Sequence, residues 1–410
     1  MPCAGYRRGS SADADPCRGT IMNVAILLSC GSFEGFFGRV LGQTRESYLA
    51  SYRGDWSWYY AAGLLQNGIK PILYIPSLVE SGRYQTDAGI DVRFLPLAAW
   101  YQPIEKRPLL KRLSRATRFS LYADERCNTL AFMAPLEQGL VQDEIGVLYV
   151  QEYWSGRFDH IVHRVGVPVV AADHGGLAKG VVKWFKRRAF AKAAVIYCQT
   201  PDECDVARQY GAPVKLQPNG CDTTQFLPNS GVERRKSVLT VARLTNKQKR
   251  TSDLIRAMAL LPDDWTLDIV GAGPDMDMLK QLTVELGVAG RVAFHGFVGR
   301  DEVQRHLQTC GVYAMPSSNE AVAIAALEAM GSGASVVLSR IRAFESLVED
   351  GVDGRLVSVG DPAALASAIL DAWENRQARG ARAAETVRRR FDTTTLYRDL
   401  ARSLRMTVSP

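Results

Sequence analysis

The order of hydrophobic and polar positions divides the chain into short apolar runs and longer segments with helical spacing. In the first half, apolar runs rich in β-branched residues cover 23–29, 70–76, 91–97, 146–151, 167–173 and 193–200. Each run is bounded by Gly, Pro or polar residues, and a segment with helical spacing follows it. This alternation of strand and helix predicts a parallel sheet that is covered by helices on both faces.

The same pattern begins again after a turn-rich segment at 214–226, in which Pro218, Asn219 and Gly220 are adjacent. A second series of apolar runs covers 237–244, 265–273, 292–298, 311–318 and 334–339. The sequence therefore predicts an α/β protein with two Rossmann-like, doubly wound domains that face a central cleft. Because ligands of such sheets bind at the carboxyl ends of the strands, the cleft is the expected site.

The expected domain boundaries follow from the places where the pattern stops. Residues 1–21 are small, polar and aperiodic and lack the long apolar core of a signal peptide, so we expect a disordered N-terminal extension before Met22. The two α/β domains are expected at 22–212 and 213–385. A C-terminal helix at 386–410 is expected to cross back to the N-terminal domain.

The composition narrows the functional class. The chain has 410 residues, of which 47% are hydrophobic and 23% charged, and no apolar run reaches the roughly 20 residues of a transmembrane helix. The net charge of +7 suits a polyanionic partner such as nucleic acid, an anionic membrane or a phosphorylated substrate. The eight cysteines form no C-x-x-C pair, which indicates reduced thiols in a cytoplasmic protein without a disulfide framework or a metal site.

Two glutamates, Glu320 and Glu328, lie at the ends of an apolar run in the segment "SSNEAVAIAALEAMGSGASVVL" at 317–338. The helix formers of the run predict that Glu320 lies at a helix entrance and Glu328 about two turns further on. A helix N-terminus suits a phosphate, and the carboxylates are then free to accept hydroxyls of a sugar and a ribose. The alternatives are a helix cap for Glu320 and a solvated helix residue for Glu328, although the apolar neighbours of Glu328 make the second one costly.

At this point the sequence resembles a known family. The segment "NEAVAIAALEAMGSGASVVLS" is similar to the E-x7-E segment of retaining glycosyltransferase family 4. Further similar pieces occur in the family's order: "AADHGG", "QPNGCDTTQF", "VARLTNKQKRTSDLIRAM", "LDIVGAGPDMDMLKQL", "RVAFHGFVGRDEVQRHL" and "LVEDGVDGRLV". The resemblance covers most of residues 165–360. It implies the GT-B fold and a metal-independent, retaining hexosyltransferase that needs no cofactor besides its co-substrate, a nucleotide-diphosphate sugar.

The resemblance also implies roles for individual residues. The N-terminal domain would bind the acceptor and the C-terminal domain the nucleotide sugar. Catalytic positions are implied at Asp173, His174 and Glu320. Donor contacts are implied at Arg243, Lys249, Phe297, Val298, Ala321, Val322, Ala323, Ile324, Glu328 and Glu345, and in the glycine-rich loop at Gly31 and Gly35. In this assignment Arg243 and Lys249 bind the diphosphate, Glu320 the sugar and Glu328 the ribose.

The chain departs from the family pattern at three positions. Ala321 and Ala323 stand where glycines are usual, and alanine does not easily adopt a positive φ. Arg250 stands where glycine is usual and the basic loop is one residue longer, so Lys247 or Arg250 could share the role of Lys249. A catalytically idle sugar-nucleotide-binding or scaffold protein, or a nucleotide-sugar epimerase of the same fold, is therefore an alternative.

Positive charge is concentrated in two segments of the N-terminal half. Residues 106–123 carry six cations and an apolar stripe of Leu110, Leu113, Thr117 and Leu121, and residues 183–192 place five cations beside Trp184 and Phe185. Basic amphipathic helices suit an anionic membrane, which predicts a lipid-linked or glycan acceptor at the inner face of the membrane; a solvated helix is the alternative. The cations do not accompany a known nucleic-acid-binding module, so we expect no nucleic acid as partner.

Overall fold

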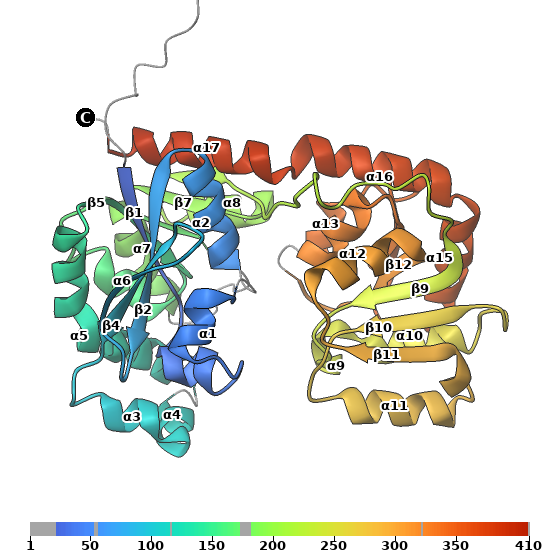
Figure 1. The fold of residues 1–410 in the computed structure, drawn as a ribbon, viewed down its shortest axis with the longest axis horizontal. Helices are drawn as coiled ribbons and strands as arrows, with labels where there is room; N and C mark the ends of the chain where they lie inside the picture. Colours follow the sequence, from blue (N-terminus) through green and yellow to red (C-terminus); the bar gives the residue numbers. More distant parts are fainter. Residues whose placement is uncertain (1–21, 53–55, 115–116, 173–181, 321–322, 409–410) are drawn as a thin grey trace, which may run out of the picture.

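The computed structural model describes residues 22–52, 56–114, 117–172, 182–320 and 323–408, so the predicted extension at 1–21 lies outside the described residues. Figure 1 shows two α/β domains side by side, with helices α16 and α17 running along one side of both. Each domain contains its own sheet, which confirms the predicted pair of doubly wound domains. Among the described residues, no helix is both long and apolar enough to cross a bilayer.

The N-terminal sheet has eight strands in the order β3-β4-β2-β1-β5-β6-β7-β8, and all neighbours are parallel except β3 and β4. In sheet order, the strands are β3 Gly82–Gln85, β4 Asp91–Pro96, β2 Ile69–Ser77, β1 Met22–Leu27, β5 Ile145–Gln151, β6 Val169–Ala172, β7 Val195–Cys198 and β8 Val214–Leu216. The helices are η1 Glu34–Gly38, α1 Arg45–Ala50, α2 Trp56–Gln66, α3 Gln102–Lys106, α4 Pro108–Ser114, α5 Arg118–Gln142, α6 Gly156–Ile161, α7 Val182–Lys192 and α8 Pro201–Arg208.

The C-terminal sheet has six parallel strands in the order β11-β10-β9-β12-β13-β14. In sheet order, the strands are β11 Val292–Gly296, β10 Thr266–Val270, β9 Arg235–Val241, β12 Cys310–Met315, β13 Ser335–Ser339 and β14 Arg355–Val357. The helices are α9 Asn246–Lys249, α10 Thr251–Met258, α11 Met276–Glu285, η2 Ala289–Arg291, α12 Arg300–Thr309, α13 Ile324–Gly331, α14 Arg342–Glu345, α15 Pro362–Glu374, α16 Arg376–Arg390 and α17 Thr393–Met406.

Each sheet buries both of its faces, as the uninterrupted apolar runs predict. In β1, Ala25 and Leu27 belong to the core beneath α5, whereas Val24 and Ile26 belong to the core beneath α2 and α17. In the same way β9 divides its side chains between one core with α13 and another with α10 and α15. Burial of a large apolar side chain stabilises a fold by about 1.5–3 kcal/mol, so these four cores make both sheets rigid platforms for the residues at their edges.

Helix α17 packs on the N-terminal domain although it follows the C-terminal one. Tyr397 lies in the core of the first sheet, and its ring centroid is 5.3 Å from that of Tyr60 in α2. A Cβ atom at Gly63 of α2 would lie 2.1 Å from the Tyr397 ring, so only glycine allows this approach of the two helices. The crossing helix begins at Thr393, after α16 has packed against α13 and β13 in the C-terminal domain.

The structure corrects three predictions of local structure. The strands β3, β8 and β14 were not predicted, and β8 belongs to the first sheet, so that sheet extends beyond the expected boundary at residue 212. The single stripe expected at 106–123 is divided between α4 and α5, because Thr117 caps a new helix by a reciprocal hydrogen bond with Ser120. In the second basic segment, Lys186 is buried and pairs with Asp159 at 2.7 Å instead of facing a membrane.

Candidate active site

The loop after β9 carries Arg243 to the carboxyl edge of the C-terminal sheet. The loop after β10 holds it there, because a Cβ atom at Gly271 would lie 1.9 Å from the carbonyl oxygen of Ala242 and one at Gly273 2.3 Å from that of Leu244. The glycines of "VGAGP" therefore permit close contact between two backbone segments. No ion pair joins the exposed Arg243 side chain to any residue that the structure describes, so its charge is available to a ligand.

The basic loop ends at Arg250, which joins α9 to α10 in the left-handed conformation with φ 50° and ψ 36°. This backbone conformation explains why glycine suits the position, since other residues adopt it at a cost. The Arg250 side chain pairs with Asp253 at 2.6 Å. Of the three cations considered for the diphosphate at this end of the loop, Lys249 is the one that contacts a predicted site residue.

Lys249 and Glu320 form the central ion pair of the site. Lys249 Nζ lies 2.5 Å from Glu320 Oε1, and the two side chains are 16% and 8% exposed. Two further hydrogen bonds hold the two loops together. The backbone N–H of Ser318 donates to the carbonyl of Gln248 at 2.8 Å, and the side-chain amide of Gln248 donates to the carbonyl of Asn319 at 3.0 Å. The structure thus joins residues that are 71 positions apart and places a cation beside the carboxylate assigned to the sugar.

Helix α13 begins later than the sequence suggests. Its first residue is Ile324, and Ala323 before it has an extended backbone with φ −77° and ψ 101°. Glu320 therefore lies in the preceding loop, four positions before the helix, which corrects the predicted helix entrance. The alanine-rich sequence favours a helix from Glu320 onward, but the extended backbone of Ala323 delays its start to Ile324. Glu328 therefore lies in the second turn of a short helix. Ala321 and Val322 lie outside the described residues.

Glu328 is a buried carboxylate with a distant partner. Its side chain is 10% exposed, and Glu328 Oε1 lies 3.4 Å from Arg300 Nη2. Burial raises the pKa of the Glu328 carboxyl to about 7, while the Arg300 guanidinium acts in the opposite direction. A carboxylate that is held this close to neutrality gains from any further hydrogen-bond donor, such as the hydroxyl groups of a ribose.

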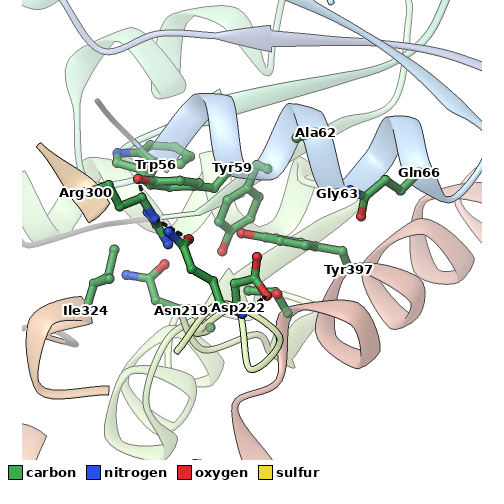
Figure 2. Close-up of a pocket in the computed structure, with 14 residues that line it drawn as sticks. Trp56, Tyr59, Ala62, Gly63, Gln66, Asn219, Asp222, Arg300, Ile324 and Tyr397 are labelled. Carbon is green, nitrogen blue, oxygen red and sulfur yellow. Dashed lines mark hydrogen bonds between the residues drawn. The ribbon is translucent and has the colours of Figure 1, made fainter. Parts of the chain in front are cut away.

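Two cavities lie between the domains, one beside Glu320 and the other beside Ile324 at the start of α13. The larger one, of about 660 Å³, lies between α8 and α14 and is lined by Asn319, Glu320 and Glu345. The smaller one, of about 190 Å³, lies between α2 and the C-terminal domain and is lined by Ile324, Arg300 and several aromatic side chains of α2. Figure 2 shows Tyr59 and Trp56 of α2 above Arg300, with Ile324 below it.

Several predicted residues lie away from these cavities. Phe297 is 89% exposed in the loop after β11, and Val298 packs against the core beneath α13. A Cβ atom at Gly31 would lie 2.7 Å from Glu105 Oε1 and one at Gly35 2.9 Å from it, so these glycines approach a buried carboxylate rather than an open phosphate pocket. Asp173 and His174 lie outside the described residues.

One group of side chains in the described part of the chain has the composition of a metal site. Asp268, His295 and His306 place their ligand atoms within 4.8 Å of one another on β10, β11 and α12. Asp268 and His295 already satisfy each other, because the carboxylate and the ring nitrogen are 2.7 Å apart. None of the three lines either cavity beside Glu320 and Glu328, so the group takes no part in the site described above.

Sequence reasoning missed Arg300, which pairs with Glu328 at the domain interface. It also missed the residues that contact Arg300, which are Tyr59, Gln225 and Phe226. Arg300 directly follows the segment "HGFVG", and Tyr59 lies in the aromatic segment "WSWYY" of α2. The density of aromatic residues in that segment was the available signal. Arg300 and Tyr59 are 241 positions apart in the sequence, and only the fold brings them together.

Known proteins match this chain over both domains. The family model for Glycosyltransferase Family 4 matches residues 77–225, and the model for glycosyl transferases group 1 matches residues 235–375. The chain is 31% identical over 278 residues to a glycosyltransferase of Methanocaldococcus jannaschii described as uncharacterized, a match that covers 58% of this chain and 71% of that protein. It is 30% identical over 275 residues to the phosphatidyl-myo-inositol mannosyltransferase of Mycobacterium leprae, which covers 61% of this chain and 71% of that protein.

A solved structure shows the same arrangement of domains. HepE of Anabaena in complex with UDP superposes with a TM-score of 0.67 and 20% identity, and the match covers 94% of this chain and 100% of that one. Likeness at this identity concerns the fold alone. Together with the matches to both family models and to the two relatives, it shows that the chain belongs to glycosyltransferase family 4 and is a glycosyltransferase with the GT-B fold.

Proposed function

We propose that this glycosyltransferase moves a hexose, with retention of configuration, from a nucleotide-diphosphate sugar to a hydroxyl of a glycan, lipid-linked or small-molecule acceptor. The observation that carries the proposal is the pairing of Lys249 with Glu320 at the wall of an interdomain cavity of about 660 Å³. This arrangement offers a cation for a diphosphate and a carboxylate for sugar hydroxyls at one point of the cleft.

The residues of the site suit positioning and charge stabilisation rather than acid–base chemistry. Arg243 and Lys249 bind the diphosphate and stabilise the negative charge that develops on the leaving nucleotide. Glu320 orients the sugar hydroxyls and Glu328 the ribose. In a front-face transfer, the donor's own phosphate oxygen accepts the proton of the acceptor hydroxyl as the new glycosidic bond forms. The two side-chain cations supply the charge neutralisation, so the proposed reaction uses no metal ion.

The names of two similar proteins bear on the acceptor and on the nucleotide of the donor. One relative is a mannosyltransferase that acts on phosphatidyl-myo-inositol, and one structural neighbour was solved with UDP. A thermal-shift screen with UDP, GDP and ADP tests the nucleotide site and the choice of base together, because a ligand that binds only the native state stabilises it. We expect one of the three to raise the melting temperature and the other two to raise it less.

Turnover separates the proposal from its alternatives. We expect the purified protein to transfer or hydrolyse at least one member of a panel of nucleotide sugars and the Glu320→Ala variant to lose this activity. If no sugar is released from any donor while nucleotide still binds both proteins, the chain is a sugar-nucleotide-binding or scaffold protein. If the donor is recovered with an inverted sugar centre and no transfer product forms, the chain is an epimerase.

We further propose that the N-terminal domain docks on an anionic membrane through residues 100–114 and 117–119. Trp100, Leu109, Leu113 and Phe119 are 56%, 68%, 60% and 61% exposed, and Lys106, Arg107 and Arg112 are exposed beside them. Exposed aromatic and aliphatic side chains among cations suit the headgroup region of a bilayer. This location favours a lipid-linked acceptor over a free glycan.

Flotation with liposomes tests this surface. We expect the protein to float with vesicles that contain phosphatidylglycerol and not with pure phosphatidylcholine, and the double variant Leu109→Ser/Leu113→Ser to remain at the bottom. Leu260→Ser is the matched control, because Leu260 is 58% exposed on the C-terminal domain. No flotation of the wild type at low salt, or equal flotation of the double variant, contradicts the proposed docking surface.

A further inference from the structure

Arg300 is held by contacts from both domains at once. It begins α12, and its guanidinium donates to the hydroxyl of Tyr59 in α2 and to Gln225 Oε1 at 2.8 Å. Its Nη2 lies 3.4 Å from Glu328 Oε1. The guanidinium lies over the rings of Tyr59 and Phe226, at 4.9 and 5.0 Å from their centroids. Figure 2 shows Arg300 beside Tyr59, with a dashed line for the hydrogen bond between them.

These contacts connect the carboxylate assigned to the ribose with the opposite domain. Tyr59 belongs to the N-terminal domain, and Glu328 to the C-terminal one. The Arg300 guanidinium contacts both Tyr59 and Glu328. It has little freedom to move away from either residue, because its donors form a fixed fork and two rings lie against it. If the domains separate, Arg300 loses the Tyr59 contacts and keeps only Gln225 and Phe226 to hold it near Glu328.

We propose that Arg300 is a positioning residue that couples nucleotide binding at Glu328 to closure of the two domains through Tyr59. The inference rests on the proposed function, since it takes Glu328 as the ribose-binding group. In the closed arrangement Arg300 acts against the effect of burial on the pKa of the Glu328 carboxyl and so favours the ionised form, which accepts ribose hydroxyls. When Tyr59 withdraws, Arg300 is less restrained and the buried carboxylate favours its protonated form. Affinity for the nucleotide and closure of the cleft then depend on each other reciprocally.

The other groups that face Glu328 do not supply this charge. Cys221 from the linker and Tyr313 from β12 interact with the carboxylate, and burial raises the pKa of the thiol and of the phenol, which keeps both neutral at pH 7. From α12, Arg300 is the cation whose ion pair with Glu328 is seen among the described residues. Burial raises the pKa of the Glu328 carboxyl, and the position of Arg300 decides how far this effect is opposed.

The test compares two variants that break different contacts between the domains. Tyr59→Phe removes the hydroxyl and keeps the ring that lies over Arg300, so packing is conserved. Asp202→Asn is the matched control, because Asp202 and Arg342 form an exposed ion pair between the domains at 2.9 Å that does not involve Glu328. The dissociation constant of the nucleoside diphosphate that stabilises the wild type is measured by calorimetry from pH 6 to pH 9.

We expect Tyr59→Phe to weaken nucleotide binding by about tenfold at pH 7, as the loss of a hydrogen bond to a charged group implies, and to move the pH midpoint of binding upward. Arg300→Lys keeps the charge without the planar fork and is expected to fall between the wild type and Arg300→Gln. Asp202 lines the larger cavity but forms no ion pair with Glu328, so Asp202→Asn is expected to leave the midpoint in place whatever its effect on affinity.

Two failures can be told apart. If the wild type binds nucleotide and Tyr59→Phe shows the same affinity and the same midpoint, Arg300 does not couple the domains, and the proposed function stands. An equal shift of the midpoint in Asp202→Asn also overturns the inference, because any loosened interface would then suffice. If the wild type binds none of UDP, GDP and ADP, the proposed function itself fails and the coupling with it.

Discussion

Glu320 and Glu328 lie eight positions apart, yet the fold places them in different electrostatic surroundings. Glu320 pairs with Lys249 at 2.5 Å in a loop beside the larger cavity. Glu328 lies in the apolar helix α13, where its nearest cation, Arg300, is 3.4 Å away. The first carboxylate has a close partner of opposite charge, whereas burial raises the pKa of the second to about 7. Equal residue type and regular spacing therefore do not imply equal chemistry.

The difference indicates a division of labour. A carboxylate with a close ammonium partner can hold sugar hydroxyls while its lysine binds a phosphate. A carboxylate with a pKa near 7 changes its charge in that range, so the strength of its hydrogen bonds depends on pH and on the position of Arg300. The comparison leads to four predictions, which separate the two residues by successively smaller effects.

The largest expected effect concerns Glu320 in turnover. Glu320→Gln removes the charge and keeps the shape, and we expect kcat/KM to fall by about 10²–10³, the range typical for loss of one preorganised electrostatic contact. Glu328→Gln is expected to lower kcat less than it raises the KM for the donor, because ribose contacts do not change during the reaction. Steady-state kinetics at saturating acceptor distinguish these outcomes. Equal losses of kcat in both variants would contradict the division of labour.

The second effect concerns stability and belongs to Glu328 alone. Its folded-state pKa of about 7 lies above the ordinary value of 4.5, so the folded state binds more protons between these values and stability falls as pH rises from 4.5 to 7. Above pH 7 the ionised carboxylate costs on the order of 3 kcal/mol, and Glu328→Gln is expected to recover most of it. Urea unfolding at pH 5 and pH 8 measures this, with stabilisation expected only at pH 8.

The third effect concerns nucleotide affinity. Because ionised Glu328 accepts ribose hydroxyls better than the protonated form, we expect the wild type to bind nucleotide up to about tenfold more tightly at pH 8 than at pH 6. Glu328→Gln is expected to bind weakly at both pH values and Glu320→Gln to keep the wild-type pH dependence. Calorimetric titration at the two pH values checks both statements. A pH dependence that survives in Glu328→Gln would assign it to another group.

The fold was largely predictable from the apolar runs. The elements that the sequence does not predict share a common cause. The strands β3, β8 and β14 have four, three and three residues, and the first two are mostly exposed. Strands this short contain no long apolar run that would predict them. The late start of α13 was not predictable either, since alanine favours a helix and only the tertiary fold gives Ala323 an extended backbone. Local preference was correct wherever burial and propensity agreed.

The site was predictable only where family resemblance supplied it. The resemblance predicts Lys249 and Glu320 because their motifs are specific, and the fold brings the two together. Arg300 and Tyr59 are 241 positions apart on different domains, and a single sequence contains no signal for a contact at that distance. The resemblance assigned Glu328 a role, but its unusual pKa depends on Arg300 and on burial in α13, which are properties of the assembled interface.

The smallest expected effect concerns the loop that holds Lys249 against Glu320. Arg250→Gly removes a left-handed residue with φ 50°, which relieves about 1 kcal/mol of backbone strain. It also removes a partly exposed ion pair with Asp253 and adds freedom to the unfolded chain, each worth about 0.5–1 kcal/mol. We therefore expect the free energy of unfolding to change by less than about 1 kcal/mol and kcat/KM to change less than threefold, because Lys249 and not Arg250 contacts Glu320. A loss of activity as large as that of Glu320→Gln would show that Arg250 takes part in donor binding together with Lys249.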